Sequence, residues 1–386
     1  MLRVEPFRED TLPAQLLGWT SGIPGVQLEL RALDAEAPKT WTMVSAADGR
    51  ARLADLPPGR YRVSGRRLLT ATERSQLGSQ SDAVAYVGSH ELTIGTVVGP
   101  EYPVPLTSAH RRGLMLSEDT FQRAMVPGFG TYFFGGFLEL YNNGTETVYL
   151  DGLQLAQAVA YPGHLAGAIE PCAVAMPRHV DPSGISTQYL VKFPGSGTSF
   201  PVAPGKTVVV AMDGIDHRNL YPRMLDLSEV DFEMPGGPDN PAIPDMIDLS
   251  IRANVLHTHG PMFDGAQAAT QVLALPGNPD GYQRVSSTNF VFMRVPARQI
   301  LDVYTTSSRR FKDDPPAGYS ICPQMVHPSF DRGYAWLVEL GDYEYTVARA
   351  RKVLFIDENG VPVLQHTRWS EQDWERAERT PGRISP

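Results

Sequence analysis

The sequence predicts an all-β protein of two β-sandwich domains, and three observations lead to that prediction. The chain has 386 residues, more than a typical single domain, so two domains with separate cores are expected. It contains 35 glycines and 33 prolines, residues that break helices and serve turns. Between the turns, short segments alternate apolar and polar residues, a period typical of strands with one buried face.

The first domain is predicted to span residues 12–107. Residues 25–31 alternate aliphatic and polar side chains, which predicts a half-buried strand. Residues 60–63 alternate arginine with tyrosine and valine, which predicts another strand whose arginines face solvent. Residues 83–98 are expected to supply a pair of strands, and residues 102–106 the last strand of the domain.

A linker is predicted at residues 108–130, because the Pro-Gly-Phe-Gly sequence at 127–130 suits a domain boundary. Within it, Ser117 and the polar residues that follow favour one helical turn with the serine as N-cap. The second domain is then predicted to span residues 131–386.

The second domain is organised around residues 136–155, which read GFLELYNNGTETVYLDGLQL. Two arms with alternating apolar side chains flank a polar tip at Asn142, Asn143 and Gly144. An Asn-Gly pair supplies the left-handed backbone positions that a tight turn needs. The stretch therefore predicts a β-hairpin with one face toward a core.

The later part of this domain is predicted to contain further core strands at residues 289–295 and 300–304. Near the end, Ser370 and Asp373 have the spacing of a capping box, and two tryptophans flank them. A short surface helix is expected there, with the tryptophans sealing the edge of the core.

These segments resemble two known families. Residues 136–155 resemble the opening of lamin-tail domains, which are immunoglobulin-like β-sandwiches. The Leu-Pro-Pro-Gly turn at 56–59 and the Tyr-Arg-Val at 61–63 resemble the small prealbumin-like or carboxypeptidase-regulatory-like modules of secreted proteins. The whole arrangement is similar to an uncharacterised family of bacterial surface lipoproteins that join such a module to an enlarged lamin-tail-like domain with a C-terminal extension.

The resemblance implies a non-catalytic, exported protein at the cell surface or outer membrane. It further implies an accessory role in outer-membrane nutrient uptake, with a protein partner in the envelope. Neither family brings a catalytic motif, so the sequence predicts no enzyme and no cofactor. Two alternatives stay open. One is a metal-dependent hydrolase, and the other is a nucleic-acid-binding accessory, because lamin-tail domains are sometimes attached to bacterial nucleases.

Composition and charge narrow the partners. Lys and Arg number 34 and Asp and Glu 43, a formal net charge of −9, so no nucleic-acid partner with a broad footprint is expected. The sequence contains no run of about 18 apolar residues, so no transmembrane segment is predicted. Residues 1–10 are mixed and charged rather than a signal segment, which by itself indicates a cytoplasmic chain, whereas the resemblance implies export.

The contact surface is predicted on two long Gly/Pro-rich segments, residues 163–187 and 234–245. Loops at the ends of a sandwich carry recognition because the strands are committed to packing. The residues predicted to bind a partner are Gly236, Asp239, Asn240, His164 and His179. The alternative is that these loops only cover exposed sheet edges.

Two histidines are the candidate metal ligands. His257 and His259 are two residues apart, so in a strand both imidazoles share a face and could bind one divalent metal. Alternatively, both belong to a polar surface loop. A carboxylate-rich set is a candidate for calcium, although its spacing is not that of an EF-hand: Asp213, Asp216, His217, Asp239, Asp245 and Asp248.

The two cysteines, Cys172 and Cys322, both fall in the second predicted domain. Two cysteines are compatible with one disulfide in an exported protein and equally with two buried thiols.

Overall fold

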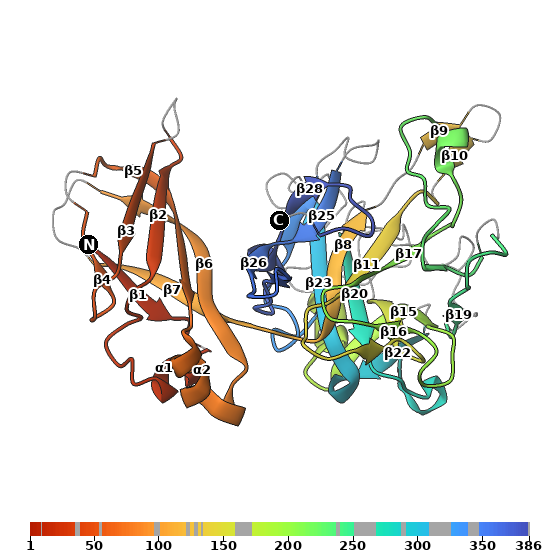
Figure 1. The fold of residues 1–386 in the computed structure, drawn as a ribbon, viewed down its shortest axis with the longest axis horizontal. Helices are drawn as coiled ribbons and strands as arrows, with labels where there is room; N and C mark the ends of the chain where they lie inside the picture. The colour runs from red at the N-terminus through yellow and green to blue at the C-terminus, as the bar shows by residue number, and fades with distance from the viewer. Residues whose placement is uncertain are drawn as a thin grey trace. The chain divides into compact units, whose positions relative to one another are not determined.

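The computed structural model describes residues 1–8, 10–34, 39–53, 56–95, 101–120, 124–126, 130–132, 134–158, 172–236, 240–250, 268–286, 291–308, 326–338 and 347–384. The all-β class predicted from the sequence is confirmed, since strands dominate both parts of the chain (Figure 1). The chain divides into two compact units. Unit 1 is Met1–Arg111 with Gln365–Thr367, and unit 2 is Arg112–Leu364 with Arg368–Pro386. None of the described helices is both long and apolar enough to cross a membrane.

Unit 1 is built on seven strands in the order β3-β2-β5-β6-β7-β1-β4. The strands are β1 (Leu2–Pro6), β2 (Gln27–Ala32), β3 (Thr40–Val44), β4 (Arg50–Ala51), β5 (Gly59–Leu68), β6 (Ala83–Ile94) and β7 (Tyr102–His110). Three short helices accompany them: α1 (Leu12–Leu16), α2 (Ala71–Leu77) and η1 (Gly78–Gln80). Helix α2 begins with a capping box, in which Thr70 and Glu73 bind each other's backbone amides.

The alternation predicted for β2 and β5 is confirmed, because every second residue of each strand enters the core. Two features differ from the sequence prediction. Residues 83–94 form the single long strand β6 rather than a strand pair. Strand β1, which lies before the predicted start at residue 12, pairs in parallel with β7 and buries Val4 completely. Its partner strand is about 100 residues away in the sequence, so no local pattern announces the pairing.

Unit 2 contains two large sheets. The six-stranded sheet has the order β18-β17-β11-β8-β25-β28, with strands β8 (Leu114–Thr120), β11 (Phe137–Asn142), β17 (Thr207–Ala211), β18 (Phe232–Glu233), β25 (Val347–Arg351) and β28 (Trp374–Glu378). The nine-stranded sheet contains β13 (Gln154–Ala158), β14 (Val180–Asp181), β15 (Gly184–Lys192), β19 (Ile247–Asp248), β20 (Ala268–Ala274), β21 (Gln283–Ser286), β22 (Val291–Pro296), β23 (Ile300–Ser308) and β24 (Ala335–Val338).

The described part of unit 2 also contains shorter elements. Three strand pairs are β9 (Ala124–Val126) with β10 (Gly130–Tyr132), β12 (Val148–Tyr149) with β16 (Pro201–Val202), and β26 (Val353–Ile356) with β27 (Pro362–Leu364). The helical segments are α3 (Cys172–His179), η2 (His217–Asn219), η4 (Pro279–Gly281), η5 (Ala297–Gln299) and α5 (Ser370–Asp373).

The two large sheets face each other across one core. Leu116, Leu140 and Val210 of the six-stranded sheet belong to the same buried cluster as Leu155 and Leu273 of the nine-stranded sheet. The outer face of the six-stranded sheet is covered as well. Met115, Tyr141 and Leu364 form a separate buried cluster there, against which Ile384 packs. Because both faces of this sheet are covered, its central strands cannot show a simple apolar–polar alternation.

The stretch 136–155 is not a β-hairpin, so that prediction is wrong. Strand β11 pairs with β8 and β17, whereas β13 pairs with β15 and β20 in the other sheet. The polar tip opens a crossover between the two sheets, in which Asn142 and Asn143 are buried and residues 145–147 are exposed. The Asn142 side-chain amide donates to the carbonyls of Glu146 and Val202, each at 2.8 Å. A crossover between two facing sheets has the same apolar alternation as a hairpin, and the sequence pattern does not separate them.

Residues assigned to a linker also form part of a sheet. The segment 114–120 is strand β8, which is central in the six-stranded sheet and buried along its full length. The helical turn predicted at Ser117 is therefore wrong, because the polar residues of this segment find partners from distant strands. Near the end of the chain, the predicted surface helix is the single turn α5, whose Ser370 and Asp373 are buried. Trp374 opens β28 and stacks on Tyr304 with ring centroids 3.6 Å apart.

Candidate functional site

The candidate site is a pair of loops that follow β17 and β18, residues 212–231 and 234–246 without 237–239, called the platform below. Strands β17 and β18 pair in parallel, so the loops that follow them leave the sheet at the same end of the strands. The predicted binding residues Gly236 and Asn240 lie in the second loop. Gly236 is exposed and Asn240 is half-buried.

Glu233 joins the two loops of the platform. Its carboxylate accepts hydrogen bonds from the backbone amides of Gly214 at 2.8 Å and of Asn240 at 2.9 Å. The side-chain amide of Asn240 donates back to the Gly214 carbonyl at 2.6 Å. A Cβ at position 214 would lie 2.8 Å from the Glu233 carboxylate and 2.5 Å from the end of the Ile243 side chain, so a larger residue there would have to displace these two side chains. One buried carboxylate thus holds both loops in a defined arrangement.

A buried chain of three side chains lies beside this contact. The Tyr132 hydroxyl lies 2.6 Å from Oδ2 of Asp213 and 3.2 Å from Nδ1 of His217. Nε2 of His217 donates to the Asp213 carbonyl at 3.0 Å, so Nδ1 of the neutral ring is an acceptor. Burial lowers the pKa of His217 and raises the pKa of Asp213 to about 6. Below that pH, protonated Asp213 can donate to Tyr132 while Tyr132 donates to Nδ1 of His217, and Oδ1 of Asp213 is the atom of these three side chains that has no partner among the described residues.

The rim of the platform is charged and exposed. Arg218 pairs with Asp216 at 2.7 Å and with Asp226 at 2.5 Å, and Asp216 also caps helix η2. Leu220 is 36% exposed beside them. The carboxylates of this region are therefore engaged by an arginine, a tyrosine and backbone amides. Among the described residues, no group of three or more His, Cys, Asp or Glu side chains is arranged to hold a metal ion, and this includes the calcium candidates Asp213, Asp216, His217, Asp245 and Asp248.

Several residues singled out from the sequence lie outside the described residues: His164, Asp239, His257, His259 and Cys322. Cys172 opens helix α3, but its side chain is outside the described part, so the disulfide stays a prediction. His179 ends the same helix and is 7% exposed, with its ring edge-on to Phe292 at 5.4 Å. The imidazole therefore packs largely in the interior, and its role in binding stays a prediction.

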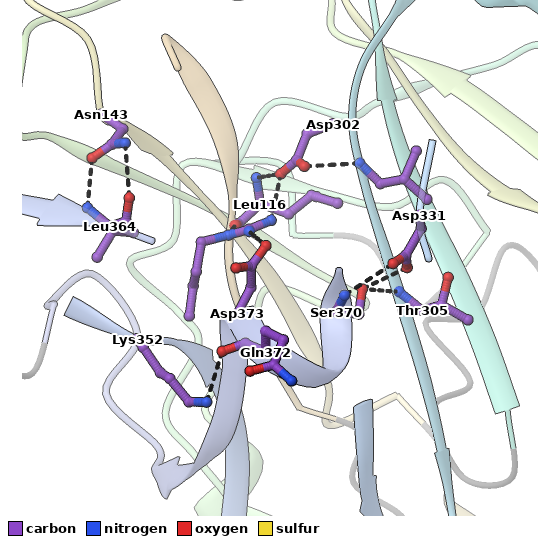
Figure 2. A network of polar contacts seen from close by, with 12 residues as sticks. Leu116, Asn143, Asp302, Thr305, Asp331, Lys352, Leu364, Ser370, Gln372 and Asp373 are labelled. Carbon is purple, nitrogen blue, oxygen red and sulfur yellow. Dashed lines mark hydrogen bonds and ion pairs between the residues drawn. The ribbon is translucent and has the colours of Figure 1, made fainter. Parts of the chain in front are cut away.

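A second polar arrangement, in the core of unit 2, was not predicted from the sequence (Figure 2). Arg351 binds Asp302 at 2.8 Å, Asp373 at 3.3 Å and the Leu116 carbonyl at 2.9 Å. Asp331 accepts from the amide and hydroxyl of Ser370, and the Ser370 hydroxyl accepts from the Thr305 amide. These groups connect β8, β23, β25 and α5. The available signal was the spacing of Arg349 and Arg351, which places both on one face of a strand.

Unit 1 contains a Ser-His-Asp contact that resembles a nucleophilic triad in its distances alone. The Ser108 hydroxyl lies 2.9 Å from Nε2 of His110, whose Nδ1 lies 2.7 Å from Asp82. However, Ser108 is 0% exposed, and its hydroxyl donates to the carboxylate of Asp10 at 2.7 Å. A buried serine facing a carboxylate is a poor nucleophile, because the negative charge opposes the oxyanion that attack creates. The contact instead fixes the end of β7.

The fold and the site thus define a β-sheet protein with a preorganised loop platform. No family model matches the chain, and no curated protein matches it. Among solved structures, it is similar to a DUF4876 family protein from Bacteroides thetaiotaomicron, with 17% sequence identity and a TM-score of 0.54. That alignment covers 98% of this chain and 95% of the other. At this level of identity the similarity concerns the fold.

Proposed function

We propose that this protein is an exported, non-catalytic binding protein of the cell surface whose platform contacts a protein partner. The observation that carries the proposal is the bridge made by Glu233 between the two loops, because it holds the loops in place before any partner arrives. Loops ordered in advance lose less conformational entropy on association. Recognition is also commonly placed on loops that a rigid scaffold supports.

The composition of the rim agrees with this role. Arg218 and Leu220 are exposed and Tyr221 is half-buried, so a charged, an aliphatic and an aromatic side chain adjoin on one loop. Arginine and tyrosine are enriched among the residues that dominate binding energy at protein interfaces. The resemblance to bacterial surface lipoproteins supports an envelope partner and an accessory role in outer-membrane nutrient uptake.

The test compares two exposed leucines of unit 2. Leu220→Asp places a charge on the rim, and Leu275→Asp places one on the loop after β20, where the leucine is 41% exposed. Each immobilised variant is offered the detergent-solubilised outer-membrane fraction of the source organism, and retained proteins are quantified against wild type. We expect Leu220→Asp to lose at least tenfold of a specifically retained protein and Leu275→Asp to keep it. Equal retention by both variants and wild type would remove the platform as the contact surface.

A further inference from the structure

Two glutamates face each other in the middle of the outer face of the six-stranded sheet. Glu118 of β8 and Glu139 of β11 are direct cross-strand neighbours, next to a bulge at Ser117. They are 2% and 0% exposed. Like charges at directly opposed positions of a sheet destabilise it, and burial adds a desolvation cost for each charge. The pair therefore needs a specific arrangement to be tolerated.

That arrangement is supplied by residues 379–384, called the strap below. The amide and hydroxyl of Thr380 donate to Glu118 at 2.9 and 3.1 Å, and the amide of Gly382 donates to Glu139 at 2.7 Å. The fourth carboxylate oxygen accepts from Ser117 at 2.9 Å. The strap is shaped for this task by its Thr-Pro-Gly-Arg turn, in which Arg383 donates to the Thr380 carbonyl and Gly382 takes φ +79°.

Each glutamate has one fixed donor and one reversible partner. The backbone amides of Thr380 and Gly382 can only donate, whereas the hydroxyls of Thr380 and Ser117 can also accept. If Glu118 is protonated, it can donate a hydrogen bond to the Thr380 hydroxyl. That hydroxyl then donates to the Arg383 carbonyl 3.1 Å away. Protonated Glu139 can donate to the Ser117 hydroxyl, which is the partner of its second carboxylate oxygen. The strap thus accommodates neutral glutamates without losing a contact.

The charges around the pair favour the neutral forms. Asp119 and Asp231 add negative charge near Glu118 and Glu139 respectively, and Asp119 is itself bound by Arg349. The nearby cation is Arg379 of the strap, whose pKa is lowered by burial. Burial, together with Asp119 for Glu118 and with Glu118 and Asp231 for Glu139, raises the pKa of Glu118 to about 7 and that of Glu139 to about 8. The hydrogen bonds from the strap, and the charge of Arg379 near Glu118, favour the ionised forms and are outweighed.

We propose that the strap is a proton-dependent latch: it stays on the sheet while Glu118 and Glu139 hold at least one proton between them, and it detaches when both are ionised. Detachment would expose the glutamates and the side of the Met115, Tyr141 and Leu364 cluster against which Ile384 of the strap packs. The strap would then change the surface of unit 2 between mildly acidic and alkaline conditions.

The test measures hydrogen exchange at the amides of Thr380 and Gly382, expressed as protection factors so that the base catalysis of exchange is corrected. In wild type we expect both protection factors to fall at least tenfold between pH 6 and pH 9, with a midpoint between 7 and 8. In the double variant Glu118→Gln/Glu139→Gln we expect the pH 6 protection to persist at pH 9. Glutamine imitates the protonated acid here, since its oxygen can accept from the strap amide while its nitrogen donates to the hydroxyl.

Two controls keep the outcome clear. Asp331→Asn changes another buried carboxyl, whose pKa burial raises to about 7, but which bonds to Ser370 rather than to the strap, so it should leave the strap's pH dependence unchanged. The amides of β20 report whether the core opens, and should stay protected at pH 9. Three outcomes would each overturn the latch. They are protection in wild type that does not depend on pH, release of the strap from the double variant at pH 9, and loss of β20 protection together with that of the strap. If the double variant fails to fold, Glu139→Gln alone should abolish the release up to pH 9, because the pair can then no longer be doubly ionised, and an unchanged midpoint would count against the proposal.

Discussion

Glu118 and Asp119 are consecutive residues of β8, yet their side chains meet opposite faces of the sheet and different partners. The Asp119 carboxylate accepts two hydrogen bonds from the Arg349 guanidinium, at 2.7 and 2.6 Å. Glu118 receives only an amide and a hydroxyl from Thr380, and burial raises its pKa to about 7. The same kind of buried acid is therefore a structural ion pair on one face and a titratable group on the other. The difference lies in whether a neighbouring strand supplies a guanidinium.

The largest expected effect tests the ion-paired face. Arg351→Met removes the cation that serves Asp302 and Asp373, leaving two buried carboxylates without compensation. We expect the free energy of unfolding to fall by about 3 to 5 kcal/mol, measured by urea denaturation at pH 7. Arg376→Met, on the exposed side of β28, is the matched control and should change stability by less than about 1 kcal/mol. Similar losses for both arginines would contradict the central role of Arg351.

The next effect tests the titratable face. Because the pKa of Glu118 and Glu139 is raised from 4.5 in the unfolded chain to about 7 and 8, the folded protein holds more protons across that interval. Their contribution to stability is thus fully present below pH 4.5 and is lost as pH rises toward 8. Glu139→Gln removes the part of this loss of stability that ionisation of Glu139 causes. We expect it to stabilise the protein by roughly 3 to 5 kcal/mol at pH 9 and to have little effect at pH 5. A stabilisation that does not depend on pH would point to packing instead.

A smaller effect on stability is expected at the platform, where the buried Glu233 holds the exposed loop that contains Gly236. Replacing residues 236–240 by a Gly/Ser linker removes Asn240 but leaves the sheets intact. We expect unfolding to change by about 1 kcal/mol, while capture of the envelope partner fails. Retained capture would move recognition away from this loop, and aggregation of the variant would show that the loop covers a sheet edge.

The smallest effect concerns metal. A core of this size can be stable without a metal ion, so chelation should leave the melting temperature nearly unchanged. A fall of more than about 5 °C, on the order of 2 kcal/mol for a domain of this size, would identify a structural ion. Repeating the measurement on His257→Ala and His259→Ala would show whether these two histidines are its ligands.

What could be predicted from the sequence depended on the distance between partners. Strands β2 and β5 show their alternation within a few residues, so their prediction was correct. Strand β8 fell within the predicted linker, and its polar residues were interpreted as a helical turn with Ser117 as the cap. Their partners, Arg349 and Thr380, lie 230 and 262 residues away. In the platform, Asn240 was predicted as a binding residue from its loop. Glu233 was not predicted, because its bridging role depends on Gly214 in another loop. The spacing of Arg349 and Arg351, two residues apart, was the one local sign of the buried network.

The position of β8 at the centre of its sheet has a consequence for the order of synthesis. Strands β8 and β11 leave the ribosome early and can pair, but Arg349 and Arg351 emerge more than two hundred residues later. Until then Asp119 has no guanidinium, and one side of β8 remains an unpaired strand edge. Such an edge is prone to misassociation, so the nascent chain would depend on chaperone protection until β25 is made. A chain stopped before residue 347 would lack β25 and both arginines, and should aggregate rather than fold.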